Sequence, residues 1–211
     1  VISPEGEMIY PDRQMILFAK QVIQNNPNSK IVFDVKCSKL LSDAIINLGG
    51  EPLICKTGHT FIKQKIRETD AQLGGEMSGH IFFNDRWPGF DDGIYAGARM
   101  LEIIAASGEK NIFYNVPNLV STPEINIPVS DDKKFEIVEK FIENSHFDDA
   151  LIIDIDGIRV EFERGWGLLR ASNTSPVLVL RFEAETENDL EDIKNLFNQN
   201  LKSIDPRLNI F

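Results

Sequence analysis

Residues 74–80 read Gly-Gly-Glu-Met-Ser-Gly-His, a polar segment framed by glycines in the first half of the chain. Three of its side chains, Glu76, Ser78 and His80, alternate at a spacing of two, so an extended backbone would point all three to the same side. Apolar residues flank the segment at both ends. This pattern predicts two buried strands that carry a short exposed tip, which is either a strand end or a tight loop.

A carboxylate, a hydroxyl and an imidazole on one face suit a ligand that is rich in hydroxyl groups. The carboxylate accepts hydrogen bonds, the hydroxyl donates and accepts them, and the imidazole can transfer a proton near neutral pH. The alternative is a glycine-rich hairpin whose polar side chains face only water. Spacing by itself leaves both interpretations open.

Around this segment, the apolar pattern predicts strands that alternate with helices. Strands are expected at 31–35 and 52–55. Helices are expected at 12–26 with Asp12 as N-cap, at 38–48, at 61–69, and at 92–106 with Ile94 and Leu101 on the buried face. These lengths indicate an α/β domain with a mixed, largely parallel sheet.

Three prolines between residues 115 and 128 mark a domain boundary. After them we expect strands near 124–129, 150–154, 157–163, 166–170 and 177–183, a helix at 131–144 with Phe135 and Ile142 facing inward, and a helix at 187–204. This order indicates a small α+β domain, an antiparallel sheet with helices on one face. The predicted domains are 7–118 and 119–211, and residues 1–6 are assigned to the end of a preceding domain.

The composition limits the choice of partners. With 211 residues, 42% of them hydrophobic and 26% charged, the chain is typical of a globular protein. Its formal net charge of −11 argues against nucleic acid and membrane surfaces, because both attract clustered basic residues. No apolar run approaches the ~20 residues of a membrane span. The two cysteines form no metal-binding pattern, so we expect reduced thiols and a cytoplasmic protein.

A second polar segment follows the predicted strand at 166–170. Residues 170–176 read Arg-Ala-Ser-Asn-Thr-Ser-Pro, and they offer a guanidinium, hydroxyls, an amide and backbone N–H groups. These are the groups that bind a phosphate dianion. The alternative is a polar turn in which Arg170 is only solvated.

Basic residues also follow two of the predicted parallel strands. Lys36 comes after the strand at 31–35, and Lys56 and His59 come after the next strand, where α/β sheets usually bind ligands. An isolated lysine at such a place is more often a solvated surface charge. The pair Asp91-Asp92 is interpreted as a helix N-cap and not as a metal site.

Four motifs occur in one order along the chain: Lys-Thr-Gly-His at 56–59, Gly-Glu-Met-Ser-Gly-His at 75–80, Gly-Phe-Asp-Asp-Gly-Ile-Tyr at 89–95 and Arg-Ala-Ser-Asn-Thr-Ser-Pro at 170–176. Together they resemble the α-D-phosphohexomutase superfamily, most closely its bacterial phosphomannomutase/phosphoglucomutase branch. The resemblance covers nearly the whole chain. It implies interconversion of hexose 1-phosphate and hexose 6-phosphate through a bisphosphorylated sugar, and a TATA-box-binding-protein-like second domain.

The resemblance also implies roles for single residues. His80 becomes a candidate for proton transfer, Glu76 and Ser78 bind sugar hydroxyls, and the loop that begins at Arg170 holds the phosphate that is not transferred. The substrate-binding residues implied in this way are Lys36, His59, Glu76, Ser78, Arg170, Ser172, Asn173, Thr174 and Ser175.

Two parts of the family's chemistry do not occur in the sequence: the serine that carries the phosphoryl group and the Asp-x-Asp-x-Asp-Arg loop that holds Mg²⁺. Mg²⁺ and a hexose 1,6-bisphosphate activator are therefore expected for the whole enzyme, and no metal or cofactor for this chain. The first residues resemble those that follow the metal loop. We expect a C-terminal half that works with hexose phosphate and with the missing N-terminal domains, and that is inactive alone. The alternative is a non-catalytic sugar-phosphate binding module.

Overall fold

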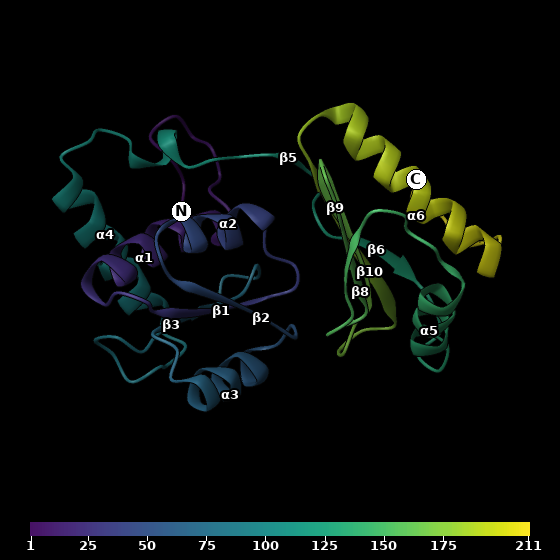
Figure 1. Ribbon diagram of the computed structural model, residues 1–211, viewed down its shortest axis with the longest axis horizontal. Helices are drawn as coiled ribbons and strands as arrows, with labels where there is room; N and C mark the ends of the chain where they lie inside the picture. The colour runs from purple at the N-terminus through teal and green to yellow at the C-terminus, as the bar shows by residue number, and fades with distance from the viewer. The chain divides into compact units, whose positions relative to one another are not determined.

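The computed structural model describes residues 1–211, which divide into two compact units, Val1–Asn118 and Leu119–Phe211 (Figure 1). The first unit is an α/β domain and the second is an α+β domain, as predicted. That residues 1–6 belong to a preceding domain stays a prediction. None of the helices is both long enough and apolar enough to span a membrane.

The first unit has a four-stranded sheet in the order β2-β1-β3-β4. The strand β1 pairs in parallel with β2 and β3, whereas β4 runs antiparallel to β3. The sheet is therefore mixed and largely parallel. Its elements are α1 (Pro11–Asn25), β1 (Lys30–Asp34), α2 (Lys39–Asn47), β2 (Glu51–Cys55), α3 (His59–Thr69), β3 (Leu73–Gly75), β4 (Ile81–Phe83), α4 (Gly93–Ser107) and the 3₁₀ helix η1 (Ile112–Asn115).

Alternation along β1 sends successive side chains to opposite faces of this sheet. Ile31 and Phe33 pack with apolar residues of α1, α2 and α4, whereas Val32 packs with Ile62 and Ile66 of α3. Helices therefore cover both faces, with α3 alone on one of them, as Figure 1 shows. Burial on both faces explains why the strands read as nearly continuous apolar runs.

The second unit has an antiparallel sheet in the order β5-β10-β9-β8-β7, and β6 also pairs with β10. Helices α5 and α6 pack on one face, where Phe141 and Phe197 contact the alternate side chains of the strands. The elements are β5 (Val120–Ser121), β6 (Ile125–Pro128), α5 (Lys134–Asn144), β7 (Leu151–Ile153), β8 (Ile158–Phe162), β9 (Gly165–Ala171), β10 (Val177–Ala184) and α6 (Glu187–Ile204).

One predicted helix cap is wrong. Helix α1 begins at Pro11, and no side chain caps it. Proline suits this first position, because its missing N–H would have no partner inside the helix. Asp12 is instead buried in the first turn, and its carboxylate accepts a hydrogen bond at 2.9 Å from the backbone N–H of Ser38.

Two predicted helix faces are also wrong in part. In α4, Ile94 is 90% exposed and Leu101 is 68% exposed, whereas Ala96, Arg99 and Met100 are buried. In α5, the residues expected to face inward include two that lie at the surface, Phe135 and Ile142. In both helices a charged side chain occupies part of the buried face, Arg99 in α4 and Lys134 in α5, and a count of apolar side chains does not reveal it.

Candidate functional site

Within the segment at 74–80, Gly74 and Gly75 belong to β3, and residues 76–80 form a tight turn between β3 and β4. The backbone N–H of Glu76 donates to the carbonyl of His80, and that of Gly79 donates to the carbonyl of Glu76, both at 2.9 Å. Gly79 has a φ of +101°, a conformation that favours glycine. We call residues 76–80 the head turn. Because the chain reverses here, the spacing of two does not align the three polar side chains on one strand face, and the tight loop is the correct alternative.

Glu76 points into the domain. It is only 2% exposed, and one carboxylate oxygen accepts the backbone N–H of Gly58 at 2.5 Å. The other oxygen accepts the Ser78 hydroxyl at 3.0 Å. Ser78 and His80 lie at the surface. Glu76 therefore connects the head turn to the start of α3 and orients the Ser78 side chain. Of these two residues, Ser78 is the more accessible to a ligand.

The two histidines of the predicted site lie close together. His59 is the first residue of α3, and its ring centroid is 5.9 Å from that of His80. The Nδ1 atom of His80 is 2.7 Å from Oδ2 of Asp91, in the loop after β4. The neighbouring Asp92 is the N-cap of α4, as predicted, since its side chain accepts the backbone N–H of Tyr95 at 2.9 Å.

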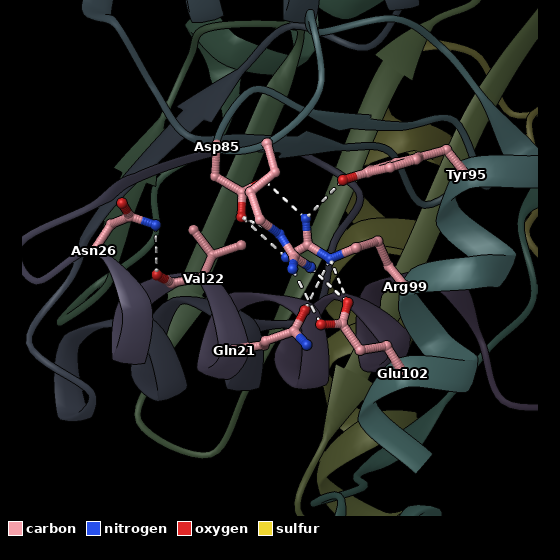
Figure 2. Close-up of polar contacts among 8 residues, drawn as sticks. Gln21, Val22, Asn26, Asp85, Tyr95, Arg99 and Glu102 are labelled. Carbon is pink, nitrogen blue, oxygen red and sulfur yellow. Dashed lines mark hydrogen bonds and ion pairs between the residues drawn. The ribbon is translucent and has the colours of Figure 1, made fainter. Parts of the chain in front are cut away.

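The loop that carries Asp91 is held at both ends. At its start, the buried Arg99 of α4 donates to both oxygens of Asp85 at 2.8 and 3.0 Å, and its Nε donates to Gln21 of α1 at 2.9 Å (Figure 2). The guanidinium also stacks over Phe83, 4.3 Å from the ring centroid. The Asp92 cap fixes the other end. These contacts keep Asp91 beside His80.

A buried carboxylate that the sequence did not reveal lies beneath the head turn. Asp34 ends β1, and it accepts hydrogen bonds from the backbone N–H of Met77, the Thr57 hydroxyl and the Cys37 thiol, each at 3.2 Å. The Lys36 ammonium is 3.8 Å away. Burial raises the pKa of Asp34, and the charge of Lys36 opposes this shift. The sequence did contain a signal for this site: Asp34 is a charged residue at the end of an apolar strand, two positions before Lys36.

Lys36 is itself buried, beyond the carboxyl end of β1. His59 follows β2 after a short loop. In the parallel part of the sheet, these two strand ends lie side by side, as their pairing from Lys30 with Glu51 to Asp34 with Cys55 shows. The sheet thus brings Lys36, His59 and the head turn to one edge of the first unit.

The second polar segment joins β9 to β10. The Ser172 hydroxyl accepts the backbone N–H groups of Thr174 at 3.3 Å and Ser175 at 3.1 Å. These two donors are therefore directed into the loop. The side chains of Asn173, Thr174 and Ser175 lie at the surface. We call residues 170–175 the Arg170 loop.

Arg170 stands at the base of this loop. It is buried, and its Nε donates to Oδ2 of Asp156 at 2.9 Å. A residue that sequence reasoning missed supports the other end of the loop. The ammonium of Lys134, at the start of α5, is buried, donates to the carbonyl of Ser175 at 3.2 Å and pairs with Asp131 at 2.7 Å. Its place before a periodic apolar helix gave only a weak signal.

The fold and the two polar loops define a protein with an α/β domain and an α+β domain, each of which presents one polar loop. Comparison with protein families makes the assignment more specific. Residues 10–115 match the model of phosphoglucomutase/phosphomannomutase, alpha/beta/alpha domain III, and residues 124–199 match the model of the C-terminal domain of the same family. The chain belongs to the phosphoglucomutase/phosphomannomutase family.

Curated relatives and solved structures agree with this assignment. The chain is 51% identical over 210 residues to a phosphomannomutase/phosphoglucomutase of Pseudomonas aeruginosa, covering 99% of the chain and 45% of the relative. It is 49% identical over 206 residues to a phosphoglucomutase of Neisseria gonorrhoeae, covering 96% of the chain and 45% of that relative. A family protein of Burkholderia thailandensis superposes with a TM-score of 0.93 at 46% identity, covering 100% of this chain and 45% of that one.

The chain therefore spans a little under half the length of the relatives that it matches. Both predicted loops fall inside the matched domains, the head turn in domain III and the Arg170 loop in the C-terminal domain. The resemblance noted in the sequence is confirmed as family membership.

Proposed function

We propose that the whole protein interconverts hexose 1-phosphate and hexose 6-phosphate through a bisphosphorylated sugar. In this proposal the present chain binds and orients the substrate. The observation that carries it is that each matched family domain presents one loop with the chemistry of one part of a sugar phosphate. This division suits phosphoryl transfer, which depends mainly on positioning and on the stabilisation of charge.

The head turn is proposed to bind ring hydroxyls. Glu76 holds Ser78 through a hydrogen bond of 3.0 Å, so the hydroxyl has a fixed place from which to donate and accept. His80, oriented by Asp91 at 2.7 Å, is proposed to transfer a proton or to bind a hydroxyl. Lys36 supplies positive charge and His59 a hydrogen-bonding imidazole at the same edge of the sheet.

The Arg170 loop is proposed to bind the phosphate that is not being transferred. Arg170 offers charge-assisted hydrogen bonds from a planar guanidinium, which matches a phosphate oxygen pair. Asn173, Thr174 and Ser175 add an amide and two hydroxyls at the surface. Ser172 acts on the loop itself, since its hydroxyl orders the backbone of Thr174 and Ser175.

Membership of the family implies Mg²⁺ and a phosphorylated serine in the whole enzyme. The residues of this chain do not fit a metal site, because no three His, Cys, Asp or Glu side chains come together in a group that could hold an ion. We therefore assign the metal, the phosphoserine and the hexose 1,6-bisphosphate activator to the rest of the protein. A binding module that acts alone is not favoured, because the relatives are about twice as long.

Titration of the 211-residue chain, followed by amide NMR, tests the proposal. Inorganic phosphate should shift the signals of residues 170–175, and hexose 6-phosphate should in addition shift those of residues 76–80. With few contacts the affinity is expected to be on the order of millimolar, or about 4 kcal/mol. Arg170→Ala should abolish the phosphate shifts while the remaining spectrum is unchanged. Shifts that cluster elsewhere, or that survive Arg170→Ala, would refute the phosphate site.

A further inference from the structure

The turn between β7 and β8 lies directly against Arg170. Pairing between β8 and β9 brings Ile158 opposite Leu169, so residues 156 and 157 reach the base of the Arg170 loop. There Oδ2 of Asp156 accepts the Nε–H of Arg170 at 2.9 Å. The two residues are 14 positions apart, so their spacing in the sequence does not predict this contact.

Gly157 makes this close approach possible. Its φ is +75°, in the region that favours glycine. A Cβ at this position would lie 2.2 Å from the carbonyl oxygen of Leu169 and 2.7 Å from Cα of Arg170. With glycine at position 157, the turn approaches the backbone of β9 more closely than it could with any other residue type at that position. This brings the short side chain of Asp156 within reach of the guanidinium.

The hydrogen bond selects which part of the guanidinium faces outward. Arginine carries five N–H donors in a fixed fork, one on Nε and two on each terminal nitrogen. Because Asp156 takes the Nε donor, the guanidinium plane is fixed and the two terminal nitrogens remain to donate to another acceptor. Asp156 also supplies a negative charge beside a buried cation, which would otherwise be costly to bury.

We propose that Asp156 is a positioning residue for Arg170, which holds the guanidinium so that its terminal nitrogens meet the phosphate bound by the Arg170 loop. This inference rests on the proposed function of that loop. Asp156 has two opposing effects on phosphate binding. Its charge repels a phosphate dianion, whereas its hydrogen bond fixes the fork in advance of binding. We assign the larger effect to the fixed orientation, since a buried fork with no partner would take several rotamers.

Phosphate titration of the 211-residue chain separates these effects. Asp156→Ala removes the hydrogen bond and the charge together, and it should raise the Kd for inorganic phosphate about tenfold. Asp156→Asn removes the charge but keeps an acceptor near Nε, so its Kd should stay within about threefold of the parent value. Asp154→Ala is the matched control, because Asp154 is an exposed acid in the same connection. It should leave the Kd unchanged.

The Nε–Hε signal of Arg170 gives a readout that general destabilisation does not move. It should be a single resolved signal in the parent and in Asp156→Asn, and it should broaden in Asp156→Ala while the other amide signals keep their positions. If the alanine variant does not fold, Asp156→Ser replaces it, because serine suits a turn but is too short to hold Nε. The same tenfold weakening is expected.

The outcomes distinguish this inference from the function on which it rests. If Arg170→Ala abolishes phosphate binding and Asp156→Ala leaves it equal or tighter, the positioning role is wrong and the phosphate loop stands. If Arg170→Ala leaves phosphate binding intact, the proposed phosphate loop itself is wrong, and the inference fails with it.

Discussion

Oδ1 of Asp34 accepts a hydrogen bond from the backbone N–H of Met77, with 3.2 Å between the two atoms. This contact joins the end of β1 to the head turn, 43 residues further along the chain. The second oxygen of Asp34 accepts the Thr57 hydroxyl, so one buried carboxylate holds two loops at the same edge of the sheet. The geometry of the head turn therefore depends on a residue outside it.

The stability of the first unit should depend on pH through Asp34. Burial raises the pKa of Asp34 above its ordinary value of 3.8. Between the pKa of Asp34 in the unfolded chain and its higher pKa in the folded chain, the folded state binds more protons than the unfolded state. The free energy of unfolding therefore falls as pH rises through this range. Asp34→Asn cannot titrate. Urea unfolding followed through NMR signals of β1 should show the parent losing stability relative to Asp34→Asn from about pH 4 upward. If the stability of the parent relative to Asp34→Asn stayed constant or rose with pH, the assigned pKa shift would be contradicted.

Removal of the Glu76 carboxylate should destabilise the chain itself. Glu76→Ala leaves the partly buried N–H of Gly58 without its acceptor, at a cost of about 1–3 kcal/mol. Glu76→Gln keeps one acceptor oxygen and should cost less. Ser78→Ala is the comparison, because it removes the hydroxyl that donates to the other Glu76 oxygen and leaves the Gly58 contact in place. Urea unfolding of the three variants measures the order, and equal stability of Glu76→Ala and the parent would contradict the contact.

In the whole protein, Glu76→Ala should also reduce mutase activity. If the head turn binds sugar hydroxyls, loss of the carboxylate should weaken transition-state binding by about 2–4 kcal/mol. Under the proposed function both directions should be affected, because the ring hydroxyls would exchange positions if the bisphosphorylated sugar reorients between the two half-reactions. The ratio kcat/KM measured in each direction tests this. An unchanged value in either direction would refute the role.

Breaking the ion pair of Arg99 and Asp85 should have a large effect on stability. Both side chains are buried, at 2% and 0% exposed, so Asp85→Ala leaves the Arg99 charge inside the first unit with only the half-exposed Glu102, 3.7 Å from its Nε, as counter-charge. The expected loss is about 3–5 kcal/mol. The neighbouring pair of Arg86 and Glu102 is 45% exposed on both sides, and Glu102→Ala should cost less than about 1 kcal/mol. Similar losses in the two variants would show that burial does not govern this network.

The exposed side of α4 should tolerate polar residues. Ile94→Ser and Leu101→Ser should change the free energy of unfolding by no more than about 0.5 kcal/mol, because both side chains face solvent. Met100→Ala, on the buried side, should cost about 2–5 kcal/mol. Urea unfolding compares the three. If Ile94→Ser proves as costly as Met100→Ala, the orientation of the helix is wrong.

The 211-residue chain alone should have no mutase activity. It contains neither the family's phosphoserine motif nor its Asp-x-Asp-x-Asp-Arg loop, and none of its acidic clusters could hold a metal ion instead. A coupled assay with glucose 1-phosphate should show no turnover above a buffer control, with the whole protein as the positive control. Turnover that copurifies with the chain and resists removal of contaminants would overturn this prediction.

Periodicity and local chemistry predicted most of the secondary structure. The Asp92 cap, both buried strands around the head turn and the long helix α6 follow from interactions within a few residues. The errors on the two helix faces arise where a charged residue is buried, Arg99 in α4 and Lys134 in α5. The buried side of α4 contains Arg99, which is stable there only because Asp85 pairs with it across 14 positions. No local pattern reports such a partner.

The sequence by itself determined the two domain classes, the family and the two polar loops, because alternation, helical period and ordered motifs are local properties of the chain. The tertiary structure decided how these loops are held. Asp34 reaches Met77, Lys134 reaches Ser175 and Asp156 reaches Arg170 across 43, 41 and 14 positions. A hydrogen bond forms only when donor and acceptor are placed to within a few tenths of an ångström, and that placement exists only after the strands have paired and the helices have packed.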